Sequence, residues 1–203
     1  SSTAITSIRA SSRVVGVTAD QQDFTAELTQ AKALAPDVLY FGGLTPIGVR
    51  IRSQMDKLGI GAQFQGTSGI VSDDFIKGLG PLAEGVVAFR EGAAAEKLPG
   101  GKVFLEKYAE QKYAQGAEAY GPFAFAAAEL VMDAIEKVGP DRKKVNAELR
   151  QVKDRDSIVG KVTFDDHGQN TVAAISKYVV QDGKWLTWED SEYATGKRKL
   201  RGR

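Results

Sequence analysis

The chain contains no cysteine and a single histidine, His167, among its 203 residues. The lack of thiols excludes a thiol nucleophile, a zinc–thiolate site and an iron–sulfur cluster, and one imidazole is too few for a multi-histidine metal site. His167 lies in the polar segment 165–170, which lacks the spacing of an EF-hand and is typical of an exposed turn. Glycine-rich nucleotide loops and Gly-x-Ser-x-Gly motifs are also lacking. We therefore expect no metal, no cofactor and no enzymatic activity.

A surplus of either charge is lacking too, because 27 lysines and arginines balance 26 aspartates and glutamates to a formal net charge of +1. Such a chain has no overall field that favours nucleic acid or an anionic membrane, and we expect no nucleic-acid partner. The one strong basic run, residues 197–203, is short and lacks interleaved aromatic residues, so we expect a solvated, frayed terminus. No apolar run is long enough to span a bilayer.

The sequence does contain an alternation of short apolar runs and helical patterns over its first 89 residues. The expected strands are residues 13–17, 38–41, 62–65 and 85–89, and the expected helices between them have Asp23, Thr45 and Ser72 as N-cap residues. The continuous apolar run at 38–41 is typical of a central strand of a parallel sheet. The alternation predicts an α/β fold with a three-layer, doubly wound parallel sheet.

The pattern changes after Arg90, where helices dominate. We expect helices at residues 103–115, 120–138 and 140–152, a strand at 162–164, and a hairpin of strands 175–180 and 184–188 around Asp182 and Gly183. Long amphipathic helices need a sheet or other helices to bury against. Either these helices pack on the first sheet, or their partner sheet belongs to sequence outside this chain.

Two strand ends carry glycines next to hydroxyl side chains. Residues 42–45 end in Leu44 and Thr45, and residues 66–69 contain Thr67 and Ser68. Because ligands of open α/β sheets bind outside the carboxyl ends of the strands, and helix amino ends there favour anions, these segments are candidate ligand contacts. The same residues are also typical of ordinary helix caps and turns. Aromatic residues at the start of the helix at 120–138, including Tyr120 and Phe123, are core residues by default or line a cleft.

Three sets of segments carry a family resemblance, namely residues 23–28, 35–43, 58–64 and 83–86, then residues 99–108, then residues 159–165 and 178–185. In that order they resemble the second lobe, the return into the first lobe and the closing strands of periplasmic leucine/isoleucine/valine-binding proteins of ABC transporters. The resemblance implies the type I periplasmic binding protein fold, in which two Rossmann-like lobes close like a hinge on a small solute. It also implies a periplasmic or extracytoplasmic location, docking on ABC permease subunits, and a signal peptide outside this chain.

The resemblance further implies that most of the first lobe is missing from this sequence. We assign residues 1–89 to the second lobe, 90–165 to helices and a strand of the first lobe, and 166–203 to closing strands that return to the second lobe, followed by a C-terminal tail. The helices between residues 103 and 152 then belong to a lobe whose sheet lies elsewhere in the protein.

Family residues transfer to this chain one position at a time. Leu44 and Thr45 stand where amino acid binders hold a ligand-contacting aromatic residue, and Ser68 stands where they hold the acid that pairs with the ligand's ammonium group. An ammonium group buried without a carboxylate partner costs several kcal/mol, so a carboxylated or amide solute is favoured over a standard α-amino acid. The predicted ligand-binding residues are Leu44, Thr45, Thr67, Ser68, Tyr120 and Phe123.

The sequence favours the substrate-binding component of an ABC importer. Two alternatives stay open, namely a ligand-sensing receptor lobe of the same fold and a flavodoxin-like or Rossmann-like enzyme. A cofactor in the purified protein would distinguish the enzyme, and a neighbouring permease gene would distinguish the importer.

Overall fold

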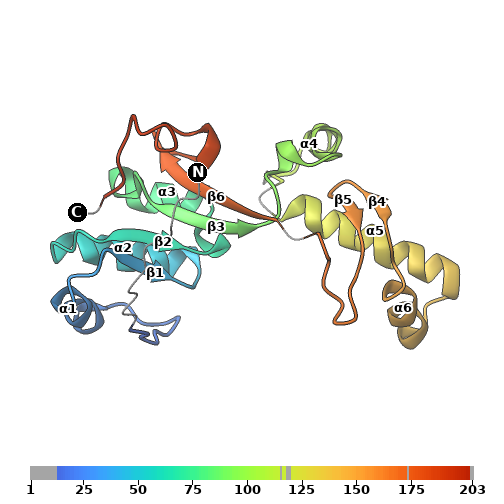
Figure 1. Cartoon of the computed structure of the whole chain (residues 1–203), viewed down its shortest axis with the longest axis horizontal. Helices are drawn as coiled ribbons and strands as arrows, with labels where there is room; N and C mark the ends of the chain where they lie inside the picture. The colour runs from blue at the N-terminus through green and yellow to red at the C-terminus, as the bar shows by residue number, and fades with distance from the viewer. Residues whose placement is uncertain (1–12, 115, 118–119, 173, 202–203) are drawn as a thin grey trace, which may run out of the picture.

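The computed structural model describes residues 13–114, 116–117, 120–172 and 174–201, which form two bodies joined by a narrow crossing (Figure 1). We call residues 13–91 and 175–201 the sheet body and residues 99–172 the helix body. The sheet body contains α1 (Thr25–Ala33), β1 (Val38–Phe41), α2 (Thr45–Lys57), β2 (Gln63–Gly66), α3 (Asp73–Leu79), β3 (Val87–Glu91), β6 (Ile175–Gln181) and β7 (Lys184–Thr187). The helix body contains α4 (Gly101–Glu110), α5 (Gly121–Val138), α6 (Arg142–Leu149), β4 (Arg155–Ser157) and β5 (Gly160–Val162).

The sheet body is built on one five-stranded sheet with the order β1-β2-β3-β6-β7. The first three strands are parallel, and β6 and β7 are antiparallel to their neighbours. The predicted α/β class is confirmed, with two antiparallel strands added at one side of the sheet. The predicted hairpin is also confirmed: Asp182 and Gly183 have φ values of 52° and 71° between β6 and β7, as a tight hairpin turn requires.

One face of this sheet carries the main hydrophobic core, under α1, α2 and α3. Aromatic rings form its centre, with Phe64 lying 6.2 Å from Phe41 and 6.4 Å from Phe75 between ring centroids. Trp185 of β7 extends the row, 5.8 Å from Phe75, and its indole N–H donates to the carbonyl of Ser72. Because aromatic side chains bury large apolar areas, this row joins the helices to both the parallel and antiparallel strands.

The C-terminal segment, residues 188–201, covers part of the opposite face of the sheet. Leu200 and the buried Tyr193 pack with β3 and β6, and Arg198 forms ion pairs with Glu84 at 2.9 Å, Asp182 at 2.9 Å and Glu192 at 2.6 Å. The expectation of a frayed terminus is therefore wrong for residues 198–201. Three carboxylates from separate parts of the chain converge on one guanidinium group, which sequence spacing does not reveal.

Two expectations about strands are also wrong. Residues 13–17 form no strand, and Val14 is 93% exposed. The run at 38–41 does form β1, but β1 is the edge of the sheet and not a central strand, and Tyr40 is 58% exposed. An extended segment needs a neighbouring strand to satisfy its backbone groups, and in the described part of the chain no strand lies beside the outer edge of β1.

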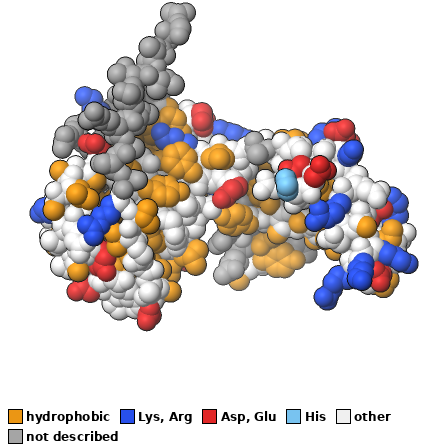
Figure 2. Space-filling model, turned by 60° about the horizontal axis from the view of Figure 1, so that its bottom comes forward, with side chains coloured by type: hydrophobic (Ala, Val, Ile, Leu, Met, Phe, Trp, Pro, Cys, Tyr) orange, Lys and Arg blue, Asp and Glu red, His pale blue; other side chains and the backbone are white. Residues whose placement is uncertain are grey.

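The helix body is held together less tightly. α5 packs against α6 and buries Leu130 and Ala134, while β4 and β5 form a separate two-stranded sheet. The remaining face of α5 exposes large apolar side chains, namely Phe125, Val131, Met132 and Ile135. Figure 2 shows hydrophobic side chains at the surface of both bodies. Within the described ranges, none of the helices combines the length and the apolar character that crossing a membrane requires.

Candidate ligand-binding site

The carboxyl ends of β1 and β2 meet at one edge of the sheet. Phe41 and Gly66 are the last partners of the β1–β2 ladder, and the amide of Thr67 donates to the carbonyl of Phe41 at 3.3 Å. The hydroxyl of Thr45 then donates to the carbonyl of Gly69 at 3.1 Å. Segments 42–45 and 66–69 are therefore adjacent, as the parallel arrangement of their strands predicts.

A short relay of hydroxyl groups ties these two segments together. Thr45 Oγ1 lies 2.9 Å from Ser72 Oγ, and Ser72 Oγ accepts a hydrogen bond from the amide of Phe75 at 3.2 Å. Ser72 is the N-cap of α3, as predicted. Thr45 is not the N-cap of α2, because Leu44 occupies that position and makes no side-chain cap. If Ser72 donates to Thr45 and Thr45 donates to Gly69, then Thr45 can offer a ligand only an acceptor lone pair.

The neighbouring hydroxyl groups are free. Thr67 and Ser68 are half-buried at the start of a short 3₁₀ helix, η1 (Ser68–Ile70), and their hydroxyls have no hydrogen-bond partner among the described residues. Leu44 is 66% exposed and its side chain lies over Gly69. A Cβ at Gly69 would lie 2.5 Å from the carbonyl oxygen of Gly43, so glycine is required where the two segments touch.

Tyr120 and Phe123 lie on the other body. Tyr120 directly precedes α5 and is exposed, while Phe123 in the first turn of α5 is half-buried and its ring contacts Gly92, next to the end of β3. The structure therefore brings Leu44, Thr45, Thr67 and Ser68 together. It places the two aromatic residues across the crossing from them.

Sequence reasoning missed a buried cation beyond the end of β2. Arg90 on β3 is only 6% exposed, its guanidinium carbon lies 4.7 Å from the centroid of the Tyr178 ring, and its Nη2 donates to the carbonyl of Ala93 at 3.4 Å. Arg90 Nε and the hydroxyl of Tyr178 are buried without partners, and burial raises the pKa of Tyr178 while Arg90 opposes that rise. No carboxylate in the described ranges forms an ion pair with Arg90. The only sequence signal is an arginine that directly follows an apolar strand pattern.

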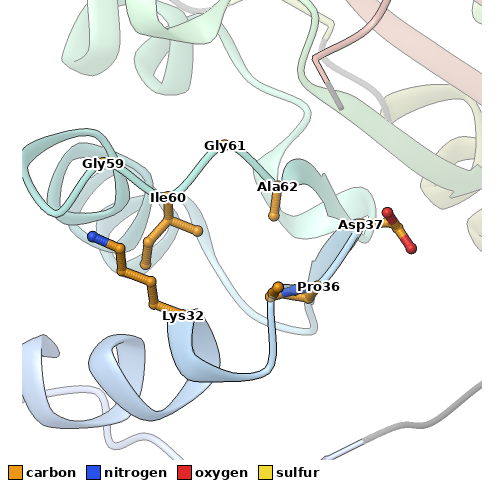
Figure 3. Close-up of a pocket in the computed structure, with 8 residues that line it drawn as sticks. Lys32, Pro36, Asp37, Gly59, Ile60, Gly61 and Ala62 are labelled. Atoms are coloured by element: carbon orange, nitrogen blue, oxygen red, sulfur yellow. The ribbon is translucent and has the colours of Figure 1, made fainter. Parts of the chain in front are cut away.

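A hollow of about 450 Å³ lies at the opposite, amino ends of β1 and β2 (Figure 3). Its lining residues are Lys32, Ala35, Pro36, Asp37, Gly59, Ile60, Gly61 and Ala62. Lys32 donates to the carbonyl of Leu58 at 2.7 Å, and the carboxylate of Asp37 points away from Lys32. This hollow is therefore distinct from the predicted ligand segments, which lie at the other end of the strands.

Parallel strands with free hydroxyls at their carboxyl ends, joined to a second body by a narrow crossing, are typical of hinged solute-binding proteins. The family model described as "Periplasmic binding protein" matches residues 3–184, and the chain belongs to this family. This confirms the family resemblance, and the names of the relatives describe binding proteins and not enzymes.

Named relatives agree with this assignment. The chain is 32% identical to the Leu/Ile/Val-binding protein BraC3 of Rhizobium johnstonii, over 85% of this chain and 47% of that protein. It is similar to the crystal structure of the leucine-binding protein LivK of Thermotoga maritima, with a TM-score of 0.75 and 26% identity, over 85% of this chain and 49% of that one. A Rhodopseudomonas palustris solute-binding protein in complex with benzoate is similar in fold, with a TM-score of 0.66 and 18% identity, over 84% and 47% of the two chains. The chain spans about half the length of the relatives it matches.

Proposed function

We propose that this chain is part of the solute-binding component of an ABC importer, located outside the cytoplasmic membrane, and that it binds a small carboxylated or amide solute between two lobes. The observation that carries the proposal is the free pair of hydroxyls on Thr67 and Ser68, held beside Thr45 where β1 and β2 end. Hydroxyls and free amides at strand ends bind a polar guest without transforming it.

The charge of the site supports an acidic solute. Ser68 provides no negative charge for an ammonium group, and Arg90 lies two residues beyond the last β2–β3 pair, Gly66 with Ala88. A buried guanidinium group without a carboxylate partner is unfavourable, and an anion nearby offsets that cost. A solute carboxylate near the crossing supplies this missing charge.

We further propose that the helix body belongs to a first lobe whose sheet lies outside this chain, with the lobe boundaries near residues 91 and 172, where β3 ends and the chain returns toward β6. The exposed apolar face of α5 supports this division, because an amphipathic helix is stable when that face is covered. Tyr120 and Phe123 then lie on the first lobe, and Tyr120 faces the solute from the side opposite to Thr67 and Ser68.

Calorimetric titration of the full-length gene product against a solute panel tests this function. The panel contains benzoate, benzamide, an aliphatic monocarboxylate and leucine. We expect binding of a carboxylate or an amide, and weak or no binding of leucine. Tight binding of leucine would overturn the interpretation of Ser68.

A substitution at Ser68 sharpens the same experiment. Ser68→Glu places a carboxylate at the position from which amino acid binders pair with the ligand's ammonium group. We therefore expect it to weaken carboxylate binding and to raise the affinity for leucine. Ser53→Glu is the matched control, because Ser53 is half-buried like Ser68 but lies in the second half of α2. An equal effect of the two substitutions on solute preference would contradict the assignment of Ser68.

The importer assignment is tested separately from binding. A strain that lacks the gene should lose uptake of the radiolabelled solute and regain it when the gene is restored. A strain that loses a response to the solute but keeps its uptake would point to a sensing receptor of the same fold.

A further inference from the structure

The chain passes between the two bodies beside Gly92, which directly follows β3. The amide of Gly92 donates to the carbonyl of Ala174 at 2.8 Å, and the hydroxyl of Ser176 donates to the carbonyl of Gly92 at 2.8 Å. Ala174 and Ser176 lie on the returning passage, at the start of β6. The outgoing and returning passages are therefore tied together at Gly92. Figure 1 shows β3 and β6 side by side where the chain crosses between the bodies.

Gly92 is also the point at which α5 reaches this crossing. Its φ of 79° lies in the left-handed region, which side chains other than glycine rarely adopt. A Cβ on Gly92 would lie 2.1 Å from Cζ of Phe123 and 2.6 Å from Cε1 of the same ring. Two independent constraints thus require glycine, namely the backbone conformation and the edge of the Phe123 ring against it.

We propose that the contact between Phe123 and Gly92 sets the angle between the sheet body and the helix body. Phe123 is then a positioning residue for solute binding and not a ligand contact. α5 begins at this contact and runs for 18 residues. A tilt of ~5° at its amino end therefore moves its far end by ~2 Å, given the rise of a helix. Because close-packed contacts resist compression, the ring limits how far the bodies rotate toward each other.

A polar tie across the crossing is weaker. Lys97, in the segment before α4, forms an ion pair with Asp190 of the sheet body at 2.9 Å. Both side chains are largely exposed to solvent, and exposed ion pairs contribute little to a fixed geometry. The packing of Phe123 on Gly92 is therefore the tighter constraint on the angle.

The test is Gly92→Ala in the full-length protein, with two readouts. The first is the distance between spin labels on Lys57→Cys and Glu136→Cys, which are exposed positions on α2 and α5 of a chain without native cysteine. The second is solute affinity. The added methyl group collides with the Phe123 ring in its present position, so the ring must move. We expect a changed label distance and an affinity lower by about tenfold.

Gly139→Ala is the matched control. Gly139 ends α5 with a φ of 80°, and a Cβ there would meet nothing within 4 Å. This substitution also places alanine at a positive φ but causes no collision, so label distance and affinity should both stay at the wild-type values. Combining Gly92→Ala with Phe123→Ala removes the collision and should restore the wild-type distance in part.

The affinity readout rests on the proposed function, whereas the distance readout does not. If the wild-type protein binds no solute of the panel, the proposed function fails while the label distances still decide this inference. The inference is overturned if Gly92→Ala leaves the label distance unchanged, as Gly139→Ala does. It is also overturned if Phe123→Ala abolishes solute binding without any change in the distance, because Phe123 is then a direct ligand contact.

Discussion

The sheet body and the helix body of this chain differ in how they bury apolar side chains. Both hydrophobic clusters of the described residues lie in the sheet body, where Phe24, Met55 and Phe75 are almost fully enclosed. On α5 the helix body buries Ala126, Leu130 and Ala134 but leaves several large side chains exposed, namely Phe125, Val131, Met132 and Ile135. The sheet body therefore has a hydrophobic core of its own, while the helix body leaves one apolar face of α5 uncovered.

This difference follows from what each body provides for its helices. The sheet gives α1, α2 and α3 a broad apolar surface, whereas α5 packs on α6 and, through Phe125, on the ring of Phe104 in α4, 5.6 Å away between centroids. A helix needs a covering layer along its whole apolar stripe to gain full stabilisation. We therefore expect the loss of unfolding free energy on truncating an apolar side chain to depend on the rest of the protein in the helix body, but not in the sheet body.

The largest effect is expected in the core of the sheet body. Phe75 is fully buried between the rings of Phe64 and Trp185, so Phe75→Ala should lower the free energy of unfolding by about 3–5 kcal/mol. Urea denaturation followed by tryptophan fluorescence measures this change, because Trp185 contacts the substituted ring. A loss below about 1 kcal/mol would contradict the arrangement of the aromatic row.

The same truncation on α5 distinguishes the two bodies. Phe125 is 44% exposed in this chain, so Phe125→Ala in a protein of residues 1–203 should lower the free energy of unfolding by at most about 1 kcal/mol. In the full-length protein a covered α5 should make the same substitution cost about 3 kcal/mol or more. Denaturation of both lengths, each with and without the substitution, gives the comparison. Equal losses in the two lengths would contradict a covering sheet outside this chain.

The next largest effect is expected at Arg90, the buried charge near the crossing. Arg90→Met replaces an unpaired guanidinium group with an apolar side chain of similar length, so the free energy of unfolding should stay the same or rise by about 1–4 kcal/mol, while carboxylate affinity falls. Arg52→Met is the control, because Arg52 is buried on α2 and pairs with Asp56 at 3.8 Å. We expect Arg52→Met to leave solute affinity unchanged. Stronger carboxylate binding by the Arg90 variant would contradict an acidic solute.

Local chemistry explains which parts of this structure the sequence predicts. The bounds of β1 follow from an apolar run between Asp37 and Gly42, and the β6–β7 hairpin follows from Asp182 and Gly183, because turn residues act on their own backbone. The helices of the helix body were likewise predicted to within a few residues, except α4, which ends five residues early at Glu110.

The errors concern contacts between distant segments. Whether residues 13–17 pair as a strand depends on a neighbour, which their own pattern does not specify. Thr45 has the sequence of a helix cap, yet its hydroxyl bonds to Gly69 because β2 brings that carbonyl within reach. Arg90 lies under the turn at Ala93, and no local signal reveals that burial. The adjacency of segments 42–45 and 66–69 was predictable, since parallel strands end at one edge.

The smallest effect is expected on the face of the sheet that the C-terminal segment covers. The Tyr193 hydroxyl donates to Glu84 at 2.7 Å, and burial, followed by that carboxylate, raises the pKa of Tyr193 to about 12. The unfolded chain loses this proton near its ordinary pKa of 10. The stabilisation is therefore complete below pH 10 and is lost as the pH rises toward 12. The stability difference between wild type and Tyr193→Phe in urea should shrink between about pH 10 and pH 12. Tyr113→Phe is a control for loss of a hydroxyl from an exposed tyrosine. A constant difference across that range would show that the C-terminal segment does not enclose Tyr193. The face of the sheet opposite to α1, α2 and α3 would then be as exposed as the apolar face of α5.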